Sequence, residues 1–229
     1  MQALSNLTFS LLDIVALLWF LVCWYGYTRY VNNSPKSLVS SMYTWRRRWS
    51  LAMLKRDNRI MDAQVITGLN NVVTFFCSTA IFITAGLFAS IGASEQIVVL
   101  INQLSFLQTT NIATVELKLG LLIVIFIYSF FKFGWAIKQH SYSAVILASV
   151  PAANDVDIEK DTPTATLMGK LSSLGSQHFN DGVRGYYFAL ATLSWFVHPL
   201  VFIAVITWVV MVLHRRDFRS KLLDHLTNP

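Results

Sequence analysis

Residues 63–94 read AQVITGLNNVVTFFCSTAIFITAGLFASIGAS and contain no charged side chain. A bilayer core is about 30 Å thick, so an apolar run of roughly 20 residues can cross it as an α-helix. Within this run we expect residues 72–93 to form a membrane span. The whole composition agrees, because 55% of the 229 residues are hydrophobic and 13% are charged, whereas ordinary soluble domains are about a quarter charged.

Three further segments are apolar enough to span a membrane, namely residues 11–28, 119–137 and 185–213. The last of these contains no charge, while Asp13 near the start of the first and Lys132 near the end of the third can extend toward water. No Lys or Arg precedes Arg29, so the first segment is expected to remain as an anchor and not to act as a cleaved signal. We therefore predict an all-α integral membrane helical bundle with four transmembrane helices, forming a single domain over residues 1–229.

A basic stretch over about residues 37–62 is predicted to form an amphipathic helix in the membrane interface. Tryptophans lie on one side of this helix and cations lie nearly opposite, as in helices that rest among lipid headgroups. The expected headgroup contacts also include a cation at the start of the last span, and they are Trp45, Arg46, Arg47, Arg48, Trp49, Lys55, Arg56 and Arg184.

Each of these cations contributes about 1 kcal/mol near an anionic leaflet. We therefore favour anionic lipids as partners of the basic stretch, ahead of a protein or a soluble anion. No recognisable nucleic-acid fold accompanies the stretch, so a nucleic-acid partner is not expected.

Orientation follows from the distribution of cations. Residues 29–59 hold eight Lys and Arg side chains, whereas the N-terminal flank and residues 94–117 hold none. The positive-inside rule then predicts a cytoplasmic basic helix and an outside N-terminus in a bacterial plasma membrane. We expect the third helix to extend beyond the bilayer as far as Pro151, followed by a mobile acidic loop over residues 151–182. Four crossings put the basic tail after residue 214 outside, and a fifth span or half-span pair over 96–112 is the alternative that brings it inside.

Three stretches together resemble the membrane-protein family catalogued as domain of unknown function 599. They are RRRWSLAMLKRDNRIMDAQ at 46–64, VVTFFCSTAIFITAGLFA at 72–89 and GVRGYYFALATLSWFVHPLVFIAVITWVVMVLHRRDFRS at 182–220. The likeness covers most of residues 10–222. It implies a multi-span membrane architecture and no established activity.

Polar side chains gather before the second span. They are Asp57, Asn58, Arg59, Asp62, Gln64 and Asn70. Arg59 and Asp62 can pair at three-residue spacing on a helix. We interpret the group as a hydrogen-bond network that clamps the cytoplasmic helix ends, and the alternative is a hydrated vestibule for a passing ion or solute.

Small residues recur along the second span at Ala85, Ala89 and Ala93. Such residues let two helices approach closely. We expect them to pack against another helix of the same chain, although a helix from a second copy would fit the same pattern.

His198 precedes Pro199 within the fourth predicted span. We expect a proline kink there, with the imidazole bonded to a freed backbone group. A haem held by His198 and His140 is disfavoured because the two residues occupy different depths in their segments. We predict no cofactor and no metal.

No nucleophile and base at a recognisable spacing, no glycine-rich phosphate loop and no metal quartet occurs in the sequence. We therefore expect a non-enzymatic protein. Because four helices enclose little space, a homo-oligomer is favoured, acting as a pore-like or lipid-organising assembly. The alternatives are an accessory subunit of a larger membrane complex and a haem or quinone redox protein.

Overall fold

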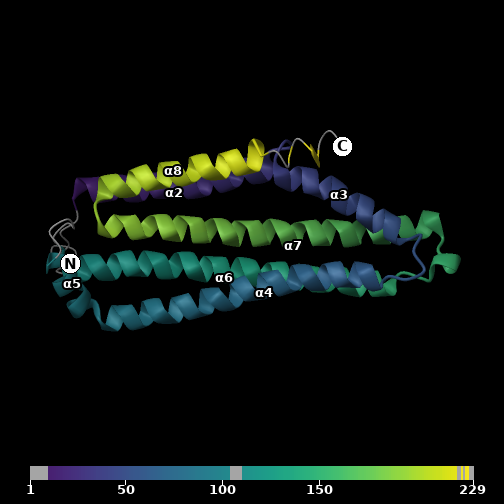
Figure 1. Ribbon diagram of the computed structural model, residues 1–229, viewed down its shortest axis with the longest axis horizontal. Helices are drawn as coiled ribbons and strands as arrows, with labels where there is room; N and C mark the ends of the chain where they lie inside the picture. The colour runs from purple at the N-terminus through teal and green to yellow at the C-terminus, as the bar shows by residue number, and fades with distance from the viewer. Residues whose placement is uncertain (1–9, 104–109, 221–222, 224, 227–229) are drawn as a thin grey trace. The chain divides into compact units, whose positions relative to one another are not determined.

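The computed structural model describes residues 10–103, 110–220, 223 and 225–226, and the described chain is almost entirely helical (Figure 1). Its elements are α2 (Leu11–Asn33), α3 (Leu38–Met53), α4 (Ile60–Gly92), α5 (Ser94–Gln103), α6 (Ile112–Ser149), η1 (Ala153–Asp155), α7 (Ile158–Leu193), η2 (Ser194–Phe196) and α8 (Pro199–Phe218). No strand occurs among these elements. The all-α prediction is confirmed.

Four stretches are long and apolar enough to cross a membrane, as predicted. They are Leu11–Met53, Ile60–Gly92, Ile112–Ser149 and Pro199–Phe218. The first stretch comprises α2 and α3, which are joined by a turn at residues 34–37. The third helix continues past the predicted span at 119–137, since α6 ends at Ser149, and its protrusion beyond the bilayer stays a prediction. Helix α6 stops there because a proline at 151 disfavours helical backbone in the residue before it.

The basic stretch over 37–62 is not one continuous helix. Helix α3 ends at Met53 and α4 begins at Ile60. The Asn58 side-chain oxygen accepts a hydrogen bond from the Ile60 N–H at 2.9 Å, which satisfies a backbone donor at the start of α4. The break turns the chain between two separate helices, which a smooth amphipathic pattern does not reveal.

The predicted acidic loop over 151–182 is wrong, because α7 begins at Ile158 and continues through this region. Asp157 starts the helix by accepting the Glu159 N–H at 3.1 Å, and Glu159 and Asp161 follow in its first turn. Acidic side chains there are favourable because the N-terminal end of a helix carries partial positive charge. The acidic run that suggests a loop is therefore a helix start.

The fourth predicted span, 185–213, is interrupted in the structure. Helix α7 ends at Leu193, and α8 starts at Pro199, the position where proline suits a helix start. The His198 Nδ1 atom accepts the Leu200 N–H at 3.1 Å. The predicted kink at His198 and Pro199 is therefore a turn between two helices, with His198 capping the second.

The described part of the predicted segment 96–112 is too short for a fifth full span. Helix α5 has ten residues, which give a length of about 15 Å, half of the hydrocarbon thickness. Residues 104–109 of the predicted segment lie outside the described residues.

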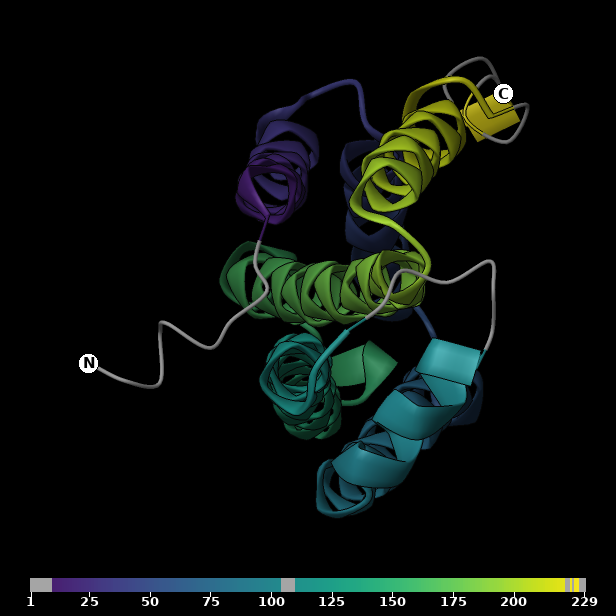
Figure 2. The ribbon, with the colours of Figure 1, turned by 90° about the vertical axis from the view of Figure 1, so that its left-hand side faces the viewer.

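The chain divides into two compact units, and the prediction of a single domain stays a prediction. The first comprises Met1–Tyr30, Thr79–Ser129 and Val183–Arg215, and the second comprises Val31–Ser78, Phe130–Gly182 and Arg216–Pro229. In the first unit, α2 and α8 lie on one side of α7 and α6 lies on the other (Figure 2). Aromatic rings fill the space, with Phe20 at 5.9 Å from Phe202 and Trp195 stacked on Phe202 at 5.1 Å between centroids.

Asp13 and Lys118 are two of the buried charges in the first unit. Asp13 accepts the Trp195 indole N–H at 2.7 Å, and the Lys118 ammonium donates to the Trp195 carbonyl at 2.9 Å. Asp13 is 2% exposed and Lys118 is 4% exposed. The expectation that Asp13 extends toward water is wrong, because Trp195 supplies the hydrogen bond that water would otherwise give.

The second unit has its own apolar core and closely packed helices. Its buried residues come from α3, α4, α6 and α7 and the segments beside them, and they are Met53, Leu54, Ile66, Leu147, Val150, Ala165 and Met168. Glycines bring α7 close to its neighbours. A Cβ atom on Gly169 would lie 2.7 Å from the Ser50 hydroxyl, and one on Gly182 would lie 2.5 Å from the Phe133 ring.

We expect Gly182→Ala to destabilise the protein by about 1–3 kcal/mol, because the buried Phe133 ring cannot make room for a methyl group without repacking. Gly134→Ala is the matched control. Gly134 is exposed beside Phe133 in the sequence, and nothing lies within 4 Å of the place that an added methyl group would take. Alanine is also the better helix former there, by up to about 1 kcal/mol. Thermal unfolding in mild detergent measures the stability of both variants. Equal unfolding midpoints for Gly182→Ala and Gly134→Ala would contradict the close packing at Gly182.

Candidate functional site

Helix α3, which carries the basic stretch, has a capped start and packs against α7 near its end. At its start the Ser37 hydroxyl accepts the Ser40 N–H at 3.3 Å, the usual role of a serine N-cap. Near its end the fully buried Ser50 lies against Gly169 of α7. The helix therefore packs as a part of the unit core.

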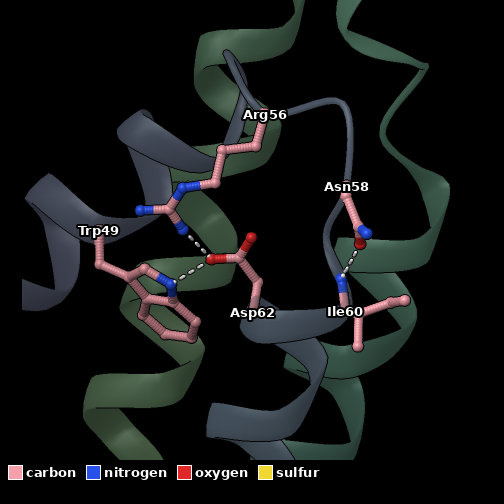
Figure 3. Close-up of polar contacts among 5 residues, drawn as sticks. All are labelled: Trp49, Arg56, Asn58, Ile60 and Asp62. Carbon is pink, nitrogen blue, oxygen red and sulfur yellow. Dashed lines mark hydrogen bonds and ion pairs between the residues drawn. The ribbon is translucent and has the colours of Figure 1, made fainter.

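Asp62 joins α3 to α4 (Figure 3). Its carboxylate is fully buried, accepts the Trp49 indole N–H at 2.6 Å and forms an ion pair with Arg56. The predicted pairing of Arg59 with Asp62 is wrong. Arg56, on the turn between the two helices, takes that place because the turn directs its guanidinium back over the start of α4.

Arg59 binds the end of α6 instead. Its two terminal nitrogens donate to the carbonyls of Val150 and Pro151, each at 2.6 Å. Carbonyls that follow a helix C-terminus lack intrahelical partners and carry partial negative charge, so a guanidinium is well suited to them. Arg59 thus ties the turn before α4 to the end of α6.

The six polar residues predicted as one network form separate contacts. Arg59 and Asp62 clamp helices as described, and Asn58 caps α4. Asp57 and Gln64 are exposed, and the Asn70 side-chain oxygen is buried without a hydrogen-bond partner among the described residues. The clamp interpretation applies to Arg59 and Asp62, and the structure does not bring the six together around a vestibule.

A second buried carboxylate connects three helices of this unit. Asp181 of α7 accepts the Lys132 ammonium of α6 at 2.8 Å and the Asn32 side-chain N–H of α2 at 3.1 Å. The Asp181 side chain is 3% exposed and the Lys132 side chain is 24% exposed. Sequence reasoning misses this group, because the three residues are far apart in the chain and only the packing of α2, α6 and α7 brings them together.

The predicted headgroup contacts fall into three groups. Arg47, Arg48 and Lys55 are exposed, and the Arg48 guanidinium lies 4.9 Å from the centre of the Trp45 ring. Trp49 and Arg56 are engaged with Asp62. Arg184 is completely buried, so the headgroup contact predicted for it is wrong.

Arg46 faces a cavity of about 370 Å³ in the second unit. The lining comes from α3, α4, α7 and the end of α8, and it comprises Leu38, Val39, Met42, Arg46, Leu69, Ser176, Phe179, Asn180, Arg216 and Asp217. Of these residues, Arg46 is the one that the sequence pattern predicts as a binding residue. The others carry no signal of their own, since their association depends on which faces of four helices meet.

A second cavity, of about 330 Å³, lies on another side of α3 and has a more hydroxyl- and amide-rich lining. It is formed by Asn32, Asn33, Ser34, Pro35, Ser37, Val39, Ser40, Tyr43, Lys170, Ser173, Leu174 and Gln177. Of the residues described in this lining, Lys170 is the one cation, and none is a carboxylate. Its chemistry suits water or small polar groups.

Histidines occupy structural positions. His140 is 1% exposed in the second unit, where a Cβ atom on Gly175 would lie 2.8 Å from its ring. His198, in the first unit, caps α8. In the described part of the chain, no group of three or more His, Cys, Asp or Glu side chains could hold a metal ion.

The small-residue face of α4 has no partner in the described chain. Ala85 and Ala89 are exposed, Ala93 is half-buried, and no atom lies within 4 Å of a Cβ position on the neighbouring Gly86. The expectation that this face packs within the chain is wrong for Ala85 and Ala89. In its strongest apolar window α4 is only 11% buried, so most of the helix is free to contact lipid or another protein.

Comparisons with known proteins give one family. The model of the family described as "Protein of unknown function, DUF599" matches residues 15–222. No curated protein and no solved structure matches the chain.

Proposed function

We propose that this chain, which belongs to the DUF599 family of proteins of unknown function, is a non-enzymatic helical membrane protein that self-associates and organises anionic lipid. Self-association uses the face of α4 formed by Ala85, Gly86 and Ala89. The lipid-binding part is α3 with its exposed cations. The pore-like form of such an assembly stays a prediction.

The exposed small-residue face of α4 carries the proposal. Lipid tails are as apolar as leucine, so helices in a membrane associate through close packing, and small residues permit the closest backbone approach. Ala85 and Ala89 lie one helical turn apart, and both are exposed beside the open Gly86 position. A second copy of α4 would fill this space.

The exposed cations of α3 support the lipid part. Arg47, Arg48 and Lys55 are free of the clamps that engage Arg56 and Arg59. Cations near an anionic leaflet each contribute about 1 kcal/mol. By the positive-inside rule we place α3 at the cytoplasmic surface and the N-terminus outside.

The test is the mass of the purified full chain in lipid nanodiscs or mild detergent. We expect the wild-type particle to contain more than one copy. The double substitution Ala85→Leu with Ala89→Leu should weaken self-association about tenfold or more, equal to about 1.4 kcal/mol, because two branched side chains keep the backbones apart.

Ala63→Leu makes the same chemical change at an exposed position of α4 outside the small-residue face, and it should leave the mass unchanged. A monomeric wild-type particle contradicts the proposal. So does a larger particle whose added mass is other polypeptides, which would indicate an accessory subunit.

A further inference from the structure

The cavity beside Arg46 combines cations with an apolar wall. Arg46 and Arg216 supply the positive charge, and Leu38, Met42, Leu69 and Phe179 supply the hydrocarbon surface. Its volume of about 370 Å³ falls within the range of small-molecule sites, roughly 300–1,000 Å³. The combination suits a ligand with an anionic group attached to an apolar part.

Arg46 is the residue of the lining that most strongly indicates an anionic ligand. It is half-buried, and its guanidinium makes no hydrogen bond or ion pair with any residue that the structure describes. A guanidinium has five N–H donors. An anion in the cavity could accept from several of these donors at once, and charge-assisted hydrogen bonds of this kind are stronger than neutral ones.

The charges of the lining indicate the charge of the ligand. Among the described lining residues, Arg46 and Arg216 are positive and Asp217 is the single carboxylate. The Arg216 Nε atom donates to Asp217 at 3.0 Å, and the Asp217 side chain is 4% exposed. One positive charge therefore remains, which matches a monoanion such as a phosphodiester.

The neutral polar residues of the lining indicate which kind of lipid headgroup fits the cavity. Ser176 and Asn180 lie one turn apart on α7 and offer a hydroxyl and an amide to the cavity. These groups suit the hydroxyls of an uncharged headgroup. A cationic headgroup is disfavoured because Asp217, the only carboxylate among the lining residues that the structure describes, is already paired with Arg216. The apolar wall makes free inorganic phosphate the poorer ligand.

We propose that this cavity is a specific site for a phosphodiester lipid with an uncharged, hydroxyl-bearing headgroup, held through its phosphate by Arg46. The cavity accommodates the phosphate and the adjoining glycerol part against Leu38, Met42 and Phe179. This inference rests on the lipid part of the proposed function and deepens it. It distinguishes one bound lipid from general attraction to the exposed cations of α3.

The test is a titration of the purified full chain in mild detergent with phosphatidylglycerol, phosphatidylcholine or inorganic phosphate. A ligand that binds only the folded protein raises its unfolding temperature, and the concentration dependence gives the apparent dissociation constant. We expect phosphatidylglycerol to stabilise most. In Arg46→Gln the dissociation constant for phosphatidylglycerol should rise about tenfold or more, as for the loss of a charge-assisted contact.

Arg47→Gln is the matched control, because it removes the same charge from the next, exposed position of α3. We expect a change of less than about twofold there. Since Arg46 has no hydrogen-bond or ion-pair partner in the described protein, Arg46→Gln should keep the lipid-free unfolding temperature. If that variant fails to fold, Asn180→Asp serves instead, because it adds a carboxylate to the cavity and should weaken phosphatidylglycerol binding similarly.

Equal losses in Arg46→Gln and Arg47→Gln would overturn the site, and so would equal stabilisation by phosphatidylcholine or by inorganic phosphate. These outcomes are separable from the self-association test. A monomeric particle that still shows an Arg46-dependent preference for phosphatidylglycerol refutes the assembly and supports the site. If the protein is an oligomer and Arg46→Gln binds phosphatidylglycerol as tightly as the wild type, the assembly is supported and the site is refuted.

Discussion

Asp181→Ala is expected to lower the free energy of unfolding by about 3 kcal/mol, the largest single effect that the structure indicates. The carboxylate accepts bonds from Lys132 and Asn32, so its loss removes contacts to α6 and α2 at once. Lys132, with a side chain 24% exposed, would lose an ion pair in a largely desolvated place. Its remaining access to water puts the effect at the lower end of the range for buried pairs. The unfolding temperature in mild detergent measures the loss.

Two variants separate this effect from a general loss of charge. Lys160→Ala breaks the pair with Asp157 at a side chain that is 84% exposed, and should leave the unfolding temperature unchanged because exposed ion pairs contribute little. Lys132→Met in the Asp181→Ala background should recover part of the stability, since it removes the unpaired cation. Equal losses in Lys160→Ala and Asp181→Ala would show that Asp181 is not a buried clamp.

Asp62→Ala should cost about 2–3 kcal/mol, because it leaves the indole N–H of the half-buried Trp49 without its acceptor and removes the partner of Arg56. The Arg56 side chain is 42% exposed and can return to water, so the cost is mainly that of Trp49. The loss should be local, at the turn between α3 and α4. Faster tryptic cleavage after Lys55 and Arg56 then accompanies the fall in unfolding temperature.

Asp62→Asn tests the origin of this cost. An amide oxygen can still accept from Trp49, while the charge that pairs with Arg56 and favours the start of α4 is lost. We therefore expect a loss of about 1 kcal/mol. Asp57→Ala, at an exposed position in the same turn, should change neither stability nor cleavage. Equal behaviour of Asp57→Ala and Asp62→Ala would contradict the clamp.

The clamps bear on the lipid site as well as on stability. Asp62 fixes the end of α3 against α4, and Gly169 lets Ser50 of α3 approach α7. Arg46 lies between Ser37 and Ser50 on this fixed helix, and α3, α4 and α7 all contribute to its cavity. Asp62→Ala should therefore weaken the lipid site indirectly, whereas Arg46→Gln acts on it directly and spares the unfolding temperature.

Some of the candidate site can be predicted from sequence and some cannot. The basic stretch, the polar approach to α4 and the small-residue face are all visible as local patterns. Their partners are not, as the pairing of Asp62 with Arg56 in place of Arg59 shows. The acidic run near residue 157 led to the wrong prediction of a loop, because the side chains that favour turns also favour helix starts.

An all-helical chain with four apolar segments long enough to span a membrane can be read from local sequence, because hydrophobicity and helix length are properties of consecutive residues. Other features follow from packing alone. They are the set of buried charges, the open face of α4 and the position of Arg46 in a cavity without a hydrogen-bond partner among the described residues. These features depend on contacts between helix faces that are far apart in the sequence, because the burial of a side chain is determined by the helix that packs against it.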